Sequence, residues 1–187
     1  MWNKGLSYRE RHGLGHKGTN EGIHTNVDDT LHTDENAPKH SLGLVFFPAF
    51  DWKISETHPE RQERLLYTRD QIVEEGLLDI PNIKEYNPIV ADWDTIERVH
   101  VGAPDLESWV TEAHRVSAGG AIAAADAVMR GEVDRAFALV RPPGHHAMAM
   151  VHGIRGFCTI NIEAVMIQHM RQTYGIKRVA VVDTDVH

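Results

Sequence analysis

The sequence predicts an α/β fold built around a parallel β-sheet, and three observations support this. Short, continuous apolar runs occur at 42–47, 136–140 and 178–183, which is typical of strands buried on both faces. Helical patterns separate these runs at 58–78, from about Leu106 to Gly131, and at 162–174. Because strands that alternate with helices are joined by crossovers, we expect parallel strands with helices covering both faces of the sheet.

Helix-capping residues delimit these elements, and two shorter elements are predicted at 83–90 (a strand) and 92–100 (a helix). Asp and Asn side chains cap helix starts, Pro fits a first turn, and Gly adopts the left-handed conformation that ends a helix. The residues predicted to occupy these positions are Pro59 in a first turn, Asp92 or Asp94 and then Asn161 as N-caps, and Gly76, Gly131 and Gly175 at helix ends.

Composition limits the class of protein. The 187 residues are 42% hydrophobic, enough for a packed core, and no run reaches the roughly 18–20 apolar residues of a membrane span. The N-terminus does not have the pattern of a secretory signal, and the single Cys158 excludes an internal disulfide framework. A formal net charge of −8 argues against nucleic-acid binding. We therefore expect a soluble, cytoplasmic protein.

The first forty residues are polar and rich in histidine, and the sequence divides into an extension at 1–41 and a domain at 42–187. Five of the 13 histidines lie there. They fit either a loose metal-binding tail or a flexible extension whose histidine spacing is accidental.

Two groups of polar side chains follow predicted strands. The loop after 136–140 holds the tandem His145 and His146, and the run at 178–183 leads into Asp183, Asp185 and His187. Residues two apart on a strand share a face, and the carboxyl ends of parallel strands meet at one edge of a sheet. We therefore expect the two groups to lie close together.

These residue types indicate metal-assisted hydrolysis. Asp185 and His187 can bind a single zinc ion, which would polarise a carbonyl group and a water molecule. One of the two neighbouring histidines is expected to be neutral and available as a base, and Asp183 is placed to orient a histidine. Alternatively, the histidine pair occupies an ordinary surface turn.

The motifs RPPGHHA, GFC and VVDTDVH, in that order, resemble those of the histone deacetylase superfamily, and HPERQER and SAGGAIAAADAV resemble its earlier landmarks. The resemblance covers about 42–187. It implies a three-layer, parallel-sheet α/β fold shared with arginase. It also implies zinc-dependent hydrolysis of acetyl-lysine in a protein or peptide, or of an acetylated polyamine, with no nucleic-acid or membrane partner.

The resemblance also assigns roles to individual residues. His146 resembles the general base, and His145 its partner, paired with Asp183. Asp185 and His187 resemble two of three zinc ligands, and Asp183 also resembles a contributor to a structural potassium site. Three residues resemble the substrate channel: Phe157 as a wall, Gly156 through its carbonyl group, and Arg64 at the base, where acetate leaves.

The sequence departs from the family pattern in three places. TINIEA follows GFC where many members have an Asn-Asn pair, and the stretch 100–119 is short. The third zinc ligand and the oxyanion-stabilising tyrosine or histidine, which follow DVH in the family, do not occur. We therefore expect a chain truncated after DVH, with a fold incomplete at its C-terminus. The alternatives are an inactive fragment that acts by binding a partner, and an arginase-like ureohydrolase.

Overall fold

The computed structural model describes residues 40–49, 52–101, 110–151 and 153–187. Most of the N-terminal extension, 1–39, therefore lies outside the described residues, as does the predicted start of the long helix near Leu106. The elements are β1 (Leu42–Phe47), α2 (Gln62–Glu74), the 3₁₀ helix η1 (Leu77–Asp79), β2 (Ile83–Tyr86), α3 (Trp93–Glu97), α5 (Glu112–Met129), β3 (Arg135–Val140) and α6 (Ile162–Tyr174).

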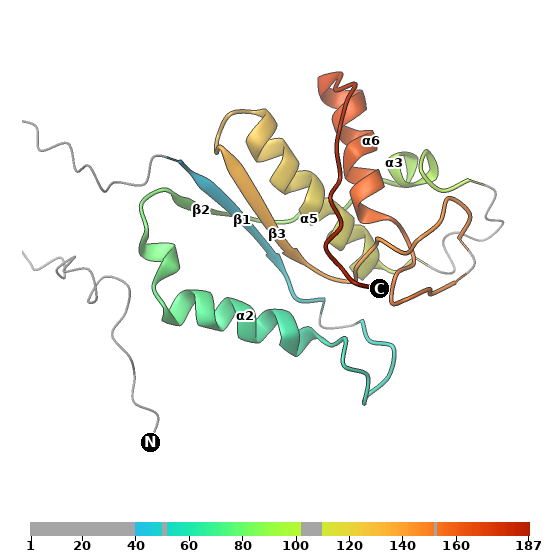
Figure 1. The fold of residues 1–187 in the computed structure, drawn as a ribbon, viewed down its shortest axis with the longest axis horizontal. Coiled ribbons are helices and arrows are strands. Elements are labelled where there is room, and N and C mark those ends of the chain that lie inside the picture. Colours follow the sequence, from blue (N-terminus) through green and yellow to red (C-terminus); the bar gives the residue numbers. More distant parts are fainter. Residues whose placement is uncertain (1–39, 50–51, 102–109, 152) are drawn as a thin grey trace, which may run out of the picture.

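The three strands form one parallel sheet in the order β2-β1-β3 (Figure 1). Leu42 is aligned with Ile83 on one side and with Arg135 on the other. The parallel α/β class predicted from the apolar runs is confirmed.

Helices cover both faces of this sheet, and the alternation of side chains along β1 explains how. Leu44 packs with Leu65 of α2, whereas Val45, on the opposite face, packs with Ala123 and Ala124 of α5. Helix α6 packs against α5 (Figure 1). The result is a three-layer arrangement with α2 on one face and the α5–α6 pair on the other.

Small residues let α5 approach its neighbours closely. A Cβ atom added to Gly119 would lie 1.9 Å from the carbonyl oxygen of Ile89, and one added to Gly120 would lie 2.6 Å from the side chain of Val140. Any larger residue at Gly119 would push α5 away from the backbone that precedes α3. The SAGGAIAAADAV stretch is thus a packing surface.

The helix ends agree with the predictions except at one proline. Asp92 and Asn161 accept hydrogen bonds from the main-chain N–H groups of Thr95 and Ala164, at 2.7 and 2.8 Å. The placement of Pro59 in the first turn of a helix is wrong, because α2 begins only at Gln62. Arg61 has extended backbone angles, and the preceding Glu60 is held by a buried ion pair to Arg141, so this segment cannot join the helix.

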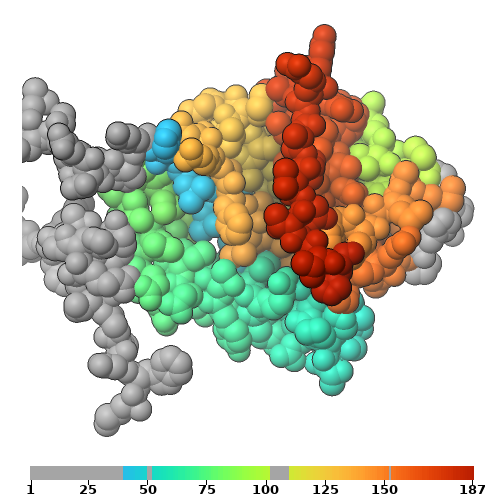
Figure 2. All heavy atoms as spheres, viewed as in Figure 1, coloured from blue at the N-terminus to red at the C-terminus, as the bar shows by residue number. Residues whose placement is uncertain are grey.

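The predicted strand at 178–183 is not present. The segment from Gly175 to His187 has no regular secondary structure, and Val182 and Val186 are 83% and 91% exposed. It forms a ridge on the molecular surface, dark red in Figure 2. A strand exists only when its main-chain groups pair with a neighbour, and no described strand pairs with this segment. Its apolar pattern is that of a strand, but its pairing is missing.

In the part of the chain that the structure describes, no helix is long and apolar enough to cross a membrane.

His114 gives the fold a marked dependence on acid. Its ring lies 5.4 Å from that of Trp52, and its Nδ1 contacts the Thr111 hydroxyl at 2.9 Å, while Nε2 has no partner among the described residues. Burial lowers the pKa of this imidazole from 6.5 to about 4, so the folded protein holds it neutral.

We expect the free energy of unfolding to fall on acidification as His114 in the unfolded chain takes up a proton that the folded chain excludes. This contribution is complete above the unfolded pKa of 6.5 and is lost as the pH falls toward 4. The loss should reach about 3 kcal/mol, since one pH unit is worth about 1.4 kcal/mol. Urea unfolding at pH 7 and pH 4.5 measures it, with His114→Leu as the non-titrating comparison. Equal acid sensitivity in both proteins would contradict the assignment.

Candidate active site

The loop after β3 carries the two neighbouring histidines and is fixed from several sides. The Ser117 hydroxyl of α5 donates a hydrogen bond to the carbonyl of Pro142 at 2.7 Å. A Cβ atom at Gly144 would lie 2.4 Å from the main-chain nitrogen of Ile162, so the loop lies directly against the start of α6. The histidine pair therefore sits on a rigid support.

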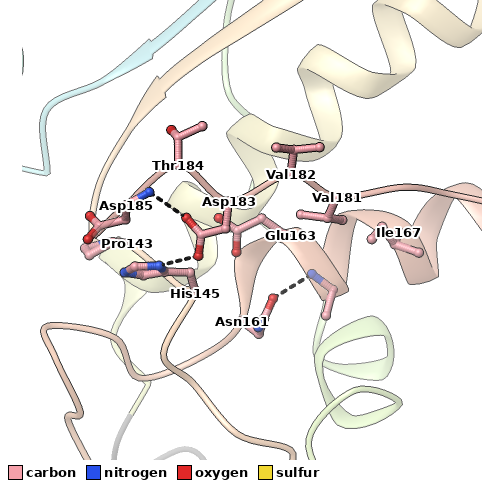
Figure 3. Close-up of a pocket in the computed structure, with 11 residues that line it drawn as sticks. Pro143, His145, Asn161, Glu163, Ile167, Val181, Val182, Asp183, Thr184 and Asp185 are labelled. Carbon is pink, nitrogen blue, oxygen red and sulfur yellow. Dashed lines mark hydrogen bonds and ion pairs between the residues drawn. The ribbon is translucent and has the colours of Figure 1, made fainter. Parts of the chain in front are cut away.

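His145 and Asp183 form the first contact between the two predicted groups. The Nδ1–H of His145 donates to Asp183 at 2.7 Å, and the other Asp183 oxygen accepts from the main-chain nitrogen of Asp185 at 3.0 Å (Figure 3). The hydrogen bond from His145 lowers the pKa of the Asp183 carboxyl group. Residues 38 apart in the sequence thus meet as expected, and His145 keeps its Nε2 on the side away from the carboxylate.

His146 lies beside His145, with ring centroids 4.0 Å apart and an interplanar angle of 34°. Its Nδ1 donates to the carbonyl oxygen of Gly156 at 3.2 Å. Hydrogen bonds to main-chain groups of His187 and Gly156 favour the protonated ring and raise the pKa of His146. These contacts therefore stabilise the protonated form of the imidazole relative to the neutral form.

Gly156 is required by its surroundings. It has φ of 50°, and an added Cβ atom would lie 2.1 Å from Nδ1 of His146. Its carbonyl oxygen faces His146 and the thiol of Cys158, 3.4 Å away. The predicted contact between this carbonyl and a substrate amide is thus not prearranged, and it stays a prediction.

Phe157 is 41% exposed, and its ring meets that of His58 edge-on at 4.6 Å. Cys158 is fully buried, and burial raises the pKa of its thiol, so it is held as a neutral group. A buried, neutral thiol is not suited to act as a nucleophile.

A cavity of about 450 Å³ brings most of the predicted site together. Its lining residues are Pro59, Glu60, Arg64, Pro143, His145, His146, Gly156, Phe157, Asp185 and His187. Of the predicted site residues, only Asp183 lies outside this lining, and it lines an adjoining cavity of about 710 Å³ with His145 and Asp185 (Figure 3). Three separate segments, 59–64, 143–157 and 185–187, thus surround one space.

Two positions near the site were not predicted from the sequence. Glu60 lines the cavity, and its carboxylate joins Arg64 to the buried Arg141. His100 is also buried, and its Nδ1 donates to the carbonyl of Met148 at 2.9 Å while its Nε2 accepts from Asn161 N–H at 2.9 Å. Burial lowers the pKa of His100, consistent with this neutral tautomer.

Two groups of side chains offer metal ligands, and they differ in geometry. An oxygen of Asp185 lies 3.4 Å from Nδ1 of His187, a separation that one ion can bridge, and both side chains are at least half exposed. The His187 main-chain N–H also donates to Asp185, which lowers the pKa of that carboxyl group and keeps it ionised. These residues fit two positions of a zinc site.

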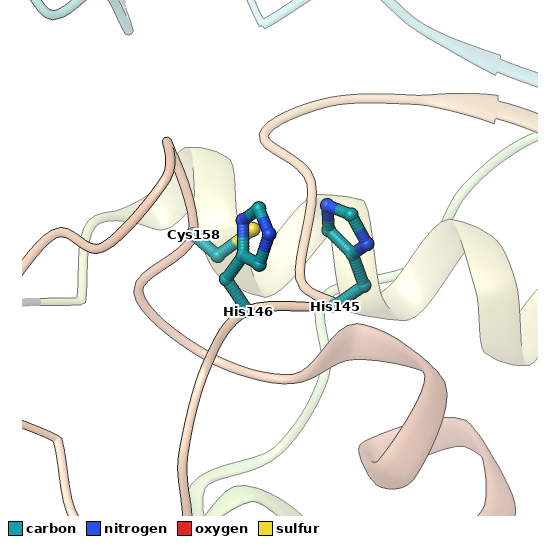
Figure 4. A group of neighbouring side chains, drawn as sticks. All are labelled: His145, His146 and Cys158. Atoms are coloured by element: carbon teal, nitrogen blue, oxygen red, sulfur yellow. The ribbon is translucent and has the colours of Figure 1, made fainter. Parts of the chain in front are cut away.

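The second group is His145, His146 and Cys158, whose ligand atoms lie within 4.8 Å of one another (Figure 4). The two imidazole rings are tilted by 34°, and Nδ1 of each is already hydrogen-bonded, in His145 to Asp183 and in His146 to the carbonyl oxygen of Gly156. The thiol is buried and neutral. This group is therefore less suited to a metal ion than Asp185 and His187.

Comparisons with known proteins find related sequences and a related fold. The histone deacetylase domain model matches residues 105–187. A probable deacetylase of Archaeoglobus fulgidus is 36% identical over 78% of this chain and 45% of its own length. The polyamine deacetylase HDAC10 of mouse is 31% identical over 73% of the chain and 24% of its own length. A histone deacetylase-like amidohydrolase of Pseudomonas aeruginosa is 50% identical over 41% of the chain and 20% of its own length.

A solved structure shows the same fold. The HD domain of HDA15 superposes with a TM-score of 0.58 at 24% identity, covering 72% of this chain and 44% of that one. The chain is an α/β protein with a histidine-rich site beyond the carboxyl ends of its parallel strands. It belongs to the histone deacetylase superfamily. It spans less than half the length of the curated relatives named above.

Proposed function

We propose that this chain contributes the histidine base, two zinc ligands and part of the substrate channel to the active site of a deacetylase. The reaction is hydrolysis of an N-acetyl amide, in acetyl-lysine or an acetylated polyamine. One observation carries the proposal: His145, His146, Asp185 and His187 surround a single cavity although they come from two distant segments. The printed names of relatives, a probable deacetylase and polyamine deacetylases, support the reaction class.

Each side chain at the site has a separate role in the proposed reaction. His146 takes the proton of the attacking water and passes it to the leaving amine. Asp183 holds the ring of His145 in place through its 2.7 Å hydrogen bond. His145 in turn lies next to His146 and supports it as the base. Phe157 forms an apolar wall for the acyl carrier, and Arg64 binds the carboxylate product.

Asp185 and His187 would hold the zinc ion, which when bound polarises the amide carbonyl and the attacking water. A catalytic zinc site takes three protein ligands, and Asp185 and His187 supply two of them. Potassium binding at Asp183 is a further proposal, and it rests on the resemblance of this residue to the contributor to a structural potassium site in the family.

The test is to measure zinc binding and hydrolysis on the same preparation. We expect a protein that contains this chain together with a third zinc ligand to bind one zinc ion and to release acetate from an acetyl-lysine peptide or from N-acetylspermidine. His187→Ala should lose zinc, whereas Asp126→Asn, which changes a carboxylate hydrogen-bonded to His169 between α5 and α6, should keep it. No zinc binding in the unsubstituted protein, or zinc binding that survives His187→Ala, would contradict the assignment of the ligands. The absence of hydrolysis by a zinc-loaded protein would instead favour a role in binding a partner.

A further inference from the structure

Arg141 is a buried cation with no free donor. Its side chain is 0% exposed, and its Nε donates to an oxygen of Glu60 at 2.8 Å. Its terminal nitrogens donate to the main-chain oxygens of Pro48, Ala49, Trp52 and Glu60 at 2.6–3.3 Å. A guanidinium group has five N–H donors, and all five are used here. Arg141 therefore cannot bind anything in the cavity, and Glu60 is its counter-charge.

Arg64 is the opposite case. Its side chain is 56% exposed, it lines the 450 Å³ cavity, and its Nε contacts the second oxygen of Glu60 at 2.7 Å. Within the described residues its two terminal nitrogens have no protein partner. They present the paired N–H groups that bind a carboxylate side-on.

The single carboxylate of Glu60 therefore forms ion pairs with two arginines. Its side chain is 5% exposed, with one oxygen on the buried Arg141 and the other on the accessible Arg64. The three side chains together carry one net positive charge at this wall of the cavity. An anion that reaches Arg64 meets a cation already partly neutralised by Glu60.

We propose that Glu60 limits the affinity of this wall for carboxylates and so sets how readily a carboxylate product leaves. The inference rests on the proposed function, in which water cleaves an N-acetyl amide and yields an amine and acetate. Arg64 attracts the acetate as it forms, and the adjacent negative charge of Glu60 prevents the acetate from being retained.

Glu60→Gln tests this role, because glutamine keeps the size of the side chain and an oxygen acceptor for Arg141 but removes the charge. We expect the protein to bind acetate about tenfold more tightly, since a unit charge a few ångströms from a bound anion is worth at least that in a partly solvated site. Titration of the protein into ¹³C-labelled acetate, followed by NMR line broadening, measures the affinity without any need for turnover. Unchanged or weaker acetate binding in Glu60→Gln would overturn the proposal.

Three further variants separate charge from shape and cover the case in which Glu60→Gln does not fold. Glu60→Asp keeps the charge and should bind acetate about as the unsubstituted protein does. Arg64→Gln should abolish acetate binding. Glu85→Gln is the matched control, because Glu85 also pairs with an arginine of α2, Arg69 at 2.9 Å, but lies outside the cavity. Tighter binding in Glu60→Asp, or acetate binding that persists in Arg64→Gln, would also overturn the proposal.

Failure of this inference and failure of the proposed function give different results. Tighter acetate binding in Glu60→Gln without hydrolysis in any variant would support the role of Glu60 and contradict the reaction. Hydrolysis with acetate affinity independent of Glu60 would do the reverse. Where both hold, steady-state kinetics should show stronger product inhibition by acetate in Glu60→Gln.

Discussion

Replacing Arg141 by methionine is expected to lower the free energy of unfolding by about 3–5 kcal/mol, the cost typical of removing one partner from a buried ion pair. The substitution leaves Glu60, 5% exposed, with only the cation of Arg64, and it removes the donors that satisfy the carbonyl oxygens of Pro48, Ala49 and Trp52. Unsatisfied buried acceptors add to the cost of the unpaired charge. Equilibrium urea unfolding at pH 7 measures the difference.

The surface pair Arg69–Glu85 provides the comparison. Arg69→Met removes the same chemical group from a 2.9 Å ion pair whose side chains are 31% and 46% exposed, and it should cost no more than about 1 kcal/mol. The double variant Arg141→Met/Glu60→Leu should recover part of the loss, because the uncompensated carboxylate is then absent. If Arg141→Met lowers the free energy of unfolding no more than Arg69→Met does, burial does not make the Arg141–Glu60 pair more stabilising than a surface pair.

The sequence predicted those parts of the fold that depend on local physics. The runs that became β1 and β3 are continuous and apolar, and Asp92 and Asn161 have the short side chains that cap helices. The run at 178–183 has the same local signal but no strand partner, and pairing is a property of the neighbouring chain. The start of α2 was misplaced for a similar reason, since a residue 81 positions away holds Glu60.

The candidate site shows the same difference between features that the local sequence predicts and features that depend on distant contacts. Sequence position was enough to predict that the two polar groups would lie close together, and the His145–Asp183 contact agrees with this although 178–183 does not form a strand. The pairing of these two particular residues was implied by the family resemblance. Glu60 and Arg141 lie in the HPERQER and RPPGHHA motifs, but the motifs do not show that these two side chains pair with each other. The sequence likewise does not show that His100 is buried. The contacts of these residues join positions 48 to 93 residues apart. The roles of the site residues in catalysis stay predictions.

In a protein that contains this chain together with the third zinc ligand, His146→Ala is expected to reduce hydrolysis of an acetyl-lysine peptide by about 10²–10⁴-fold, the range typical of losing a positioned acid–base group. The zinc content of the variant should stay close to that of the unsubstituted protein, because the ligand atoms belong to Asp185 and His187. The separation follows from geometry: the ring of His146 is held by the carbonyl oxygen of Gly156 and contacts only the main chain of His187, so it does not touch the two ligand side chains. Steady-state kinetics and metal analysis of the same sample measure both quantities.

Two comparisons make this result specific to the base. His145→Ala should have a smaller effect on turnover, because His145 acts through Asp183 and the neighbouring ring and does not itself take the proton. His169→Ala removes an imidazole whose partner is Asp126, and it should leave hydrolysis unchanged. Normal turnover in His146→Ala would remove this residue from the mechanism. Loss of zinc together with activity would instead mean that its ring supports the metal ligands, and the assignment of the base would then pass to His145.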